Sequence, residues 1–75
     1  MEYNEFIERN PEILGGKPII KGTRIGVELI VRKLGNGYSI EQLLQSYPHL
    51  KQQQIYACMS YAADLIGGEA AIPVG

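Results

Sequence analysis

Three stretches of the chain repeat apolar residues with the period of an α-helix. Within residues 27–34 the apolar positions stand at i, i+3, i+4 and i+7, which lines one face of a helix. Residues 39–46 and 51–66 show similar spacing. The apolar positions are Val27, Ile30, Val31 and Leu34; Ile40, Leu43 and Leu44; and Ile55, Cys58, Met59, Ala62, Leu65 and Ile66. The pattern therefore predicts a mainly α-helical chain with three helices.

Local signals mark where these helices begin and end. Ser39, followed three residues later by Gln42, is a capping box that starts the second helix. Pro48 cannot continue a helix, so the second helix has to stop before it. Gly35-Asn36-Gly37 is expected to end the first helix, and Gly67-Gly68 the third.

Residues 1–25 do not repeat with a helical period and are expected to form an arm. Residues 2–9 could form a turn of helix, or Phe6 and Ile7 could start a strand. Further on, Pro18 leads into Ile19-Ile20, which suits a short strand bounded by glycine turns. We interpret the arm as a short β-hairpin or a pair of extended segments. Two strands alone are marginally stable, so the arm must lie on the helices or pair with another chain.

The second and third helices, joined by a tight turn at residues 47–50, predict a helix-turn-helix. Three helices with this spacing match a homeodomain-like core in which the third helix reads DNA. The apolar positions fit only if the turn is one residue longer than usual. A plain three-helix core without a nucleic-acid role fits the same pattern. At 75 residues the chain is one domain, with an arm at 1–25, a helical core at 26–66 and a flexible tail at 67–75.

Charge is unevenly distributed although the net charge is only −1. Residues 1–16 hold one arginine and four glutamates, a sum of −3. Residues 17–51 hold six cations and two glutamates, a sum of +4, and residues 52–75 hold only Asp64 and Glu69, a sum of −2. A basic centre permits a surface that faces DNA, but the near-neutral total argues against binding by electrostatics alone.

The start of the third helix supplies side chains suited to reading DNA. Glutamine can pair with adenine in the major groove, and lysine can reach a phosphate or guanine. With a single cation there, a monomer would bind weakly, so DNA binding calls for a homodimer. Three glutamines are equally an ordinary solvated helix start. The candidate DNA-binding residues are Lys17, Lys21, Arg24, Arg32, Lys51, Gln52, Gln53, Gln54 and Tyr56, with Ser60 and Tyr61 also expected to face outward.

Other residues offer little for catalysis or metal binding. His49, the only histidine, stands in a turn, where it caps or packs, and Cys58 lies on an apolar stripe that favours core packing. Zinc-ligand clusters and paired carboxylates are absent from the sequence, so we expect no enzyme, cofactor or metal site. Thr23 is expected to hold the arm by bonding to backbone. Arg24 could pair with Glu28 or contact phosphate.

The sequence also gives expectations for the cellular compartment and for the C-terminal tail. No apolar run approaches the roughly 20 residues that span a bilayer, and the acidic N-terminus lacks the features of a leader, so a cytoplasmic protein without membrane contact is expected. In the tail, Ile72, Pro73 and Val74 could dock on a protein partner and order on binding. A disordered terminus is the favoured alternative.

Two motifs, spaced as they are here, make the chain resemble the bacterial family catalogued as domain of unknown function 433. The residues that carry the likeness, within about residues 6–66, are Gly15, Gly16, Lys17, Pro18, Ile20, Gly22, Thr23 and Arg24, and then Ser39, Ile40, Glu41, Leu43, Leu44, Tyr47, Pro48, His49 and Leu50. The resemblance implies a helix-turn-helix-like fold behind a β arm. It also implies a VapB-like antitoxin, often encoded beside a PIN-like ribonuclease toxin.

The chain departs from this family at two positions. Gly26 stands where the family usually has proline, and Lys51 where it usually has a threonine or serine cap. Losing such a cap costs about 1 kcal/mol and puts a cation at the positive end of a helix dipole. A phosphate nearby would offset that cost, and a tolerated poor cap explains it as well. Two functions are expected: a DNA-binding antitoxin that represses its own operon, or a module that only binds a protein partner.

Overall fold

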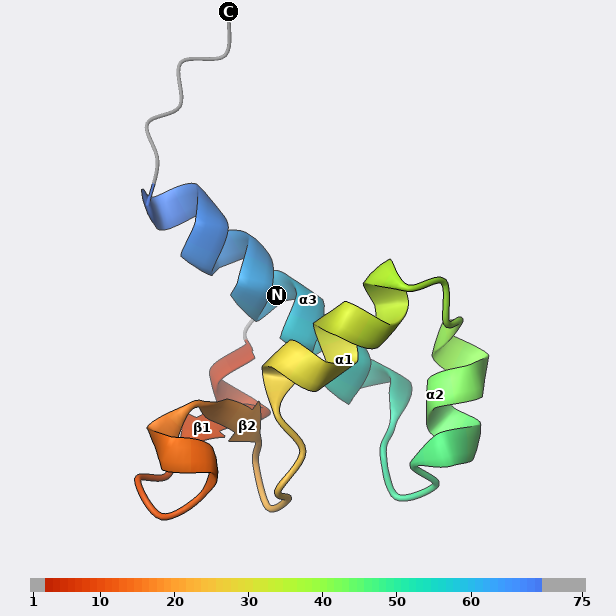
Figure 1. Cartoon of the computed structure of the whole chain (residues 1–75), viewed down its shortest axis with the longest axis horizontal. Helices are drawn as coiled ribbons and strands as arrows, with labels where there is room; N and C mark the ends of the chain where they lie inside the picture. Colours follow the sequence, from red (N-terminus) through yellow and green to blue (C-terminus); the bar gives the residue numbers. More distant parts are fainter. Residues whose placement is uncertain (1–2, 70–75) are drawn as a thin grey trace, which may run out of the picture.

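A computed structural model describes residues 3–69 as a three-helix core with a two-stranded hairpin at one end (Figure 1). The elements are the 3-10 turns η1 (Tyr3–Glu5) and η2 (Leu14–Gly16), strands β1 (Ile7–Arg9) and β2 (Pro18–Ile20), and helices α1 (Val27–Gly35), α2 (Ile40–Ser46) and α3 (Gln52–Glu69). The predicted mainly helical fold with an N-terminal hairpin is confirmed. None of the helices within residues 3–69 has the length and apolar content needed to cross a lipid bilayer.

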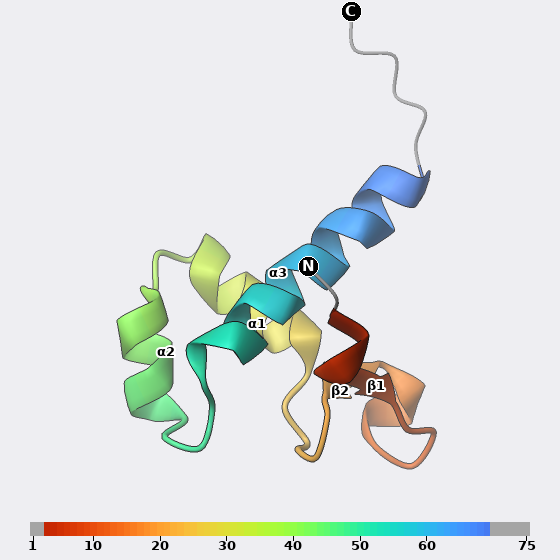
Figure 2. The same ribbon diagram turned by 180° about the vertical axis from the view of Figure 1, so that it is seen from behind.

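The arm is an antiparallel hairpin that lies against α1 and α3 (Figures 1 and 2). Ile7 of β1 stands opposite Ile20 of β2, and both side chains are buried. Of the two alternatives for the N-terminus, the strand forms from Ile7, and the helical one is limited to the 3-10 turn η1 before it. Thr23 fixes the arm as predicted: its hydroxyl donates to the Ile20 carbonyl at 2.7 Å and accepts from the Ile25 amide at 3.0 Å.

The helix termini confirm two predicted signals and contradict a third. In α2 the Ser39 hydroxyl accepts from the Gln42 amide at 3.0 Å, and the Gln42 side chain accepts from the Ser39 amide at 2.7 Å. Gly37 follows α1 with φ +98°, a conformation that favours glycine. The prediction that Gly67-Gly68 ends the third helix is wrong, since α3 continues through both to Glu69. Glycine lowers helix propensity by about 1 kcal/mol without blocking the helical backbone.

One apolar cluster holds the hairpin and the three helices together. Its buried members are Ile7, Ile20, Val27, Ile30, Leu43, Leu50, Ile55, Ala57 and Cys58. The stripe predicted for the third helix is correct at Ile55 and Cys58 but not beyond, because Met59, Leu65 and Ile66 are exposed. Residues 63–68 are exposed, and this end of α3 extends past α1 and the hairpin (Figure 1).

Tyr61 also lies differently from the prediction, which placed it outward. Its side chain packs against the core, and its ring meets Tyr3 edge-on with the centroids 5.3 Å apart. Its hydroxyl accepts a hydrogen bond from Arg9 Nη2 at 2.7 Å. The reason is a tertiary contact: the arm folds back onto this turn of α3. The apolar period of a single helix cannot predict such a contact.

Candidate nucleic-acid interface

The connection between α2 and α3 is longer than a standard helix-turn-helix turn, as predicted. Five residues, 47–51, separate Ser46 from Gln52, against the usual three or four. The Leu50 amide donates to the Tyr47 carbonyl at 2.9 Å and closes the turn. Leu50 is buried with Leu43 and Ile55, so the turn and both helices share one apolar contact. The start of α3 is therefore held firmly relative to α2.

The start of α3 exposes a small polar surface whose members have different roles. Lys51, immediately before α3, has no side-chain oxygen to cap the helix, and Gln54 supplies half of a capping box instead. The Gln54 Oε1 accepts from the Lys51 amide at 2.7 Å. Gln52 Nε2 donates to the Tyr56 hydroxyl one turn later at 2.6 Å. Gln53 is exposed between them. Gln54 thus supports the helix start, while Gln52, Gln53 and Tyr56 face solvent.

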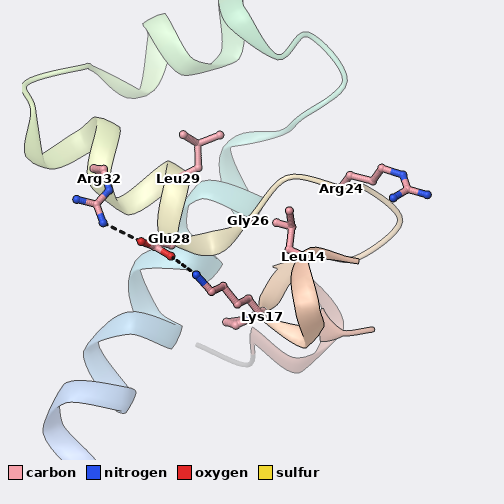
Figure 3. A pocket seen from close by; sticks show the side chains of 8 residues that line it. Leu14, Lys17, Arg24, Gly26, Glu28, Leu29 and Arg32 are labelled. Atoms are coloured by element: carbon pink, nitrogen blue, oxygen red, sulfur yellow. Dashed lines mark hydrogen bonds and ion pairs between the residues drawn. The ribbon is translucent and has the colours of Figure 1, made fainter. Parts of the chain in front are cut away.

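Arg24 lies on the loop that approaches the turn between α2 and α3. Residues 22–25 and 46–50, His49 among them, line a hollow of about 540 Å³. Arg24 is exposed and points away from Glu28 (Figure 3), and it makes no hydrogen bond or ion pair with any residue of 3–69. The suggested Arg24–Glu28 pair is therefore not formed. Lys21 lies in the same loop, with its Nζ 3.4 Å from the Asn4 carbonyl oxygen.

Glu28 pairs with two other predicted DNA-binding cations (Figure 3). Its carboxylate accepts from Arg32 Nη2 at 2.7 Å and lies 3.5 Å from Lys17 Nζ. The hydrogen bond from Arg32, together with the charges of Arg32 and Lys17, lowers the pKa of the Glu28 carboxyl. Both cations line two hollows on α1: Arg24 also lines one of them, and the other reaches Leu65 in the second half of α3. The structure thus separates Lys17 and Arg32 from the start of α3.

These placements show which parts of the site the sequence could reveal. Glu28 and Arg32 are four residues apart on one helix, a spacing at which opposite charges meet. The Lys17–Glu28 pair joins the arm to α1 and has no signal of that kind. The sequence did not indicate the residues that shape the α1–α3 hollow. Val31 and Leu65 are the main ones, and their spacing predicted only an apolar helix face.

Cys58 has the packing role expected of it. The side chain is fully buried in the core cluster, and loss of solvent contact raises the pKa of the thiol to about 12. The group is thus a protonated thiol at neutral pH. Over the part of the chain that the structure describes, no cluster of three or more His, Cys, Asp or Glu side chains could hold a metal ion.

The fold defines a small trihelical protein with a helix-turn-helix-like pair and a β arm. Residues 7–62 match the family model described as "Protein of unknown function (DUF433)", and the chain belongs to this family.

Two similar proteins agree with that assignment. "Uncharacterized protein y4eO" of Sinorhizobium fredii (strain NBRC 101917 / NGR234) is 34% identical over 58 residues, which cover 77% of this chain and 26% of that protein. The crystal structure of a DUF433 member protein from Anabaena variabilis ATCC 29413 superposes with a TM-score of 0.80 at 28% identity, over 87% of this chain and 64% of that one. The chain thus spans about a quarter of the first and under two thirds of the second.

Proposed function

We propose that this protein is a dimeric, DNA-binding, antitoxin-like protein that represses its own operon and neutralises a PIN-like ribonuclease toxin. The observation that carries the DNA-binding part is the exposed start of α3, which buried Leu50 holds against the core and Lys51 directly precedes. Arg24 lines a hollow with the turn before α3 and forms no ion pair with any residue of 3–69. The antitoxin part rests on the family resemblance. As a cytoplasmic protein it would meet both DNA and a ribonuclease.

In this proposal the polar residues at the start of α3 divide the work of binding. Gln52 and Gln53 approach base edges, where a glutamine amide can pair with adenine. Lys51 and Arg24 contact phosphates, which carry affinity without sequence information. A phosphate near Lys51 would also relieve the unfavourable placement of a cation at the positive end of the α3 dipole. Two such surfaces in a dimer double the number of phosphate contacts.

Salt-dependent binding to DNA from upstream of the gene tests this proposal. The affinity should fall steeply between about 50 and 200 mM salt, because binding releases counterions from the phosphates. Lys51→Gln and Arg24→Gln should each weaken binding to specific and scrambled duplexes alike and reduce the salt slope by about 1 per subunit. Gln53→Ala should weaken binding to the specific duplex alone.

Lys33→Gln is the matched control for these variants. It removes the same charge from the far end of α1, where the Lys33 Nζ lies 4.7 Å from the centre of the Tyr38 ring. Figure 1 places this end of α1 opposite the turn between α2 and α3. Failure to bind DNA at low salt, or a salt slope near zero, would refute the DNA-binding part.

Co-purification with the product of the neighbouring gene tests the toxin part. A PIN-like protein encoded there should co-purify with the full chain. If Ile72, Pro73 and Val74 hold it, truncation after Glu69 should abolish co-purification while far-UV circular dichroism stays unchanged, because α3 remains complete. Unchanged co-purification would place the toxin contact elsewhere, and no co-purification of the full chain would refute the toxin part.

A second candidate function is a protein-interaction module that does not bind DNA. The net charge of −1 and the apolar hollow between α1 and α3 favour it. The two candidates differ in the DNA titration, since only the first predicts a salt-dependent complex.

A further inference from the structure

The end of α3 carries two large apolar side chains that no other part of residues 3–69 buries. Figures 1 and 2 show it extending beyond α1 and the hairpin. Ile55 and Cys58 in the first half are fully buried, whereas the Leu65 and Ile66 side chains are 50% and 71% exposed. Two adjacent large apolar residues on a projecting helix leave a patch that a partner could bury with a gain of free energy.

A hollow that could receive such a helix end lies beside the same segment. It has a volume of about 480 Å³ and is formed by the arm, α1 and α3. Val31, Ala62 and Leu65 supply its apolar lining, and Lys17 and Arg32 stand at its edge. Glu28 pairs with both cations, so this edge keeps one excess positive charge. The hollow is therefore apolar with a positive rim.

The projecting segment has the complementary chemistry. Asp64 and Glu69 are the charged residues among residues 55–69; Asp64 is exposed and forms no ion pair with any residue of 3–69. It stands directly before Leu65 and Ile66. An apolar helix end with a negative charge thus accompanies an apolar hollow with a positive rim. A continuous helix cannot fold its own end back into a hollow along its side, so another molecule has to supply it.

We propose that this other molecule is a second copy of the chain. Two copies associate about a two-fold axis, with Leu65 and Ile66 of each entering the hollow between α1 and α3 of the other. Asp64 then faces Lys17 and Arg32 across the interface. A two-fold arrangement satisfies both hollows and both helix ends at once, which closes the assembly as a dimer.

This inference deepens the dimer in the proposed function by giving it a surface. The interface lies on the second half of α3, away from Lys51, Gln52 and Gln53, so both copies keep the start of α3 free. A second hollow shares Lys17, Glu28 and Arg32 with the first and is also lined by Arg24, with Leu14 of η2 and Leu29 of α1 exposed in it (Figure 3). It lies next to the proposed interface and is not part of it.

Sedimentation equilibrium of the full chain and its variants tests the interface. The wild type should be a dimer. Leu65→Glu and Ile66→Glu should each weaken the dimer by about 100-fold, the size expected for a central apolar contact. Both side chains are exposed in the single chain, so the variants should keep the far-UV spectrum of a folded protein. Met59→Glu is the matched control, because Met59 is 38% exposed on α3 but does not line the hollow.

Asp64→Lys tests the charge complementarity. It should weaken the dimer at least about tenfold at low salt and less at high salt, because it brings a cation towards Lys17 and Arg32. A wild type that stays monomeric, an unchanged dimer in Leu65→Glu and Ile66→Glu, dissociation by Met59→Glu, or a strengthened dimer in Asp64→Lys would each overturn the interface.

The result can be separated from that of the proposed function. A wild-type dimer that fails to bind the upstream duplex contradicts DNA binding and leaves the interface intact. Salt-dependent binding to the duplex by the wild type, together with a Leu65→Glu variant that remains dimeric, supports DNA binding and contradicts the interface. Binding of the toxin to a monomer, lost in Leu65→Glu, would assign the hollow to that partner and overturn the second copy as its occupant.

Discussion

Gln53 and Gln54 show how adjacent identical residues can have different roles. The Gln54 side chain accepts the Lys51 amide at 2.7 Å, whereas Gln53 is exposed to solvent. We expect Gln54→Ala to lower the free energy of unfolding by about 0.5–1 kcal/mol, the usual net value of such a bond. Gln53→Ala should change it by less than about 0.5 kcal/mol. Urea unfolding followed by far-UV circular dichroism measures both, and equal losses would contradict the assigned cap.

Cys58 carries a second prediction for a single residue. Its thiol is buried, so alkylation by iodoacetamide at mildly alkaline pH should be slow in the folded protein and fast in urea. Because burial raises the thiol pKa from 9.0 to about 12, the unfolded chain loses this proton first. The buried, protonated thiol therefore contributes its full share of the free energy of unfolding below pH 9.0, and this contribution is lost as the pH rises towards 12. The difference in free energy of unfolding between the wild type and Cys58→Ala, measured against pH, isolates this contribution. A difference that grows above pH 9.0 would contradict a buried thiol with a raised pKa.

The glycines after α1 and within α3 allow a prediction for whole elements. At Gly37, Gly67 and Gly68 an added Cβ would meet no atom within 4 Å, so space does not distinguish them. Gly37 has φ +98°, where a side chain is strained, whereas Gly67 and Gly68 lie within α3. Gly67→Ala and Gly68→Ala should each stabilise the end of α3 by up to about 1 kcal/mol.

Gly37→Ala is the matched contrast, and it should destabilise the protein. Helicity by far-UV circular dichroism and amide exchange over residues 61–69 measure the effect on α3, and urea unfolding measures that on Gly37. An unchanged amide exchange in the α3 variants would mean that the last turn is absent in solution.

The same glycines mark how far the sequence could predict the elements. Signals that act through specific bonds were reliable: the Ser39–Gln42 capping box and the turn after α1 both formed where expected. Gly67-Gly68 misled because a glycine pair stops a helix only if the chain turns there, and the pair itself does not require a turn. The period of α3 likewise identified Ile55 and Cys58 but could not show where the rest of the molecule ceases to cover the helix.

At the scale of the whole molecule, the missing information was tertiary. Tyr61 turns inward because Tyr3 and Arg9 reach it from the opposite end of the chain. The ion pair between Lys17 and Glu28 likewise forms because the arm packs against α1. The sequence showed which residues could bind DNA, but it could not show that the fold places these residues on different parts of the surface. Lys51 directly precedes α3 and Arg24 lines a hollow with the turn before it, while Lys17 and Arg32 line the α1–α3 hollow; Arg24 also shares a second hollow with Lys17 and Arg32.

This packing of arm on helices predicts that the protein unfolds as one unit. Ile20 of the hairpin is fully buried in the same cluster as Ile30 and Ile55 of the helices. Ile20→Ala should therefore lower the free energy of unfolding by about 2–5 kcal/mol, and it should do so equally for hairpin and helix. Leu29→Ala, at a 40% exposed position on α1, is the control and should cost less than about 1 kcal/mol.

Amide exchange separates this prediction from independent unfolding of the arm. The Lys21 amide donates to the Phe6 carbonyl across the hairpin at 2.8 Å, so it reports on the arm, while amides in the middle of α1 and α3 report on the helices. In one cooperative unit these amides exchange with the same free energy, and Ile20→Ala reduces it by the same amount at each. Faster exchange at Lys21 than in the helices would show that the arm opens alone. Because Tyr61 and Lys17 depend on that arm, the hollow between α1 and α3 would then lose one of its walls whenever the arm opened.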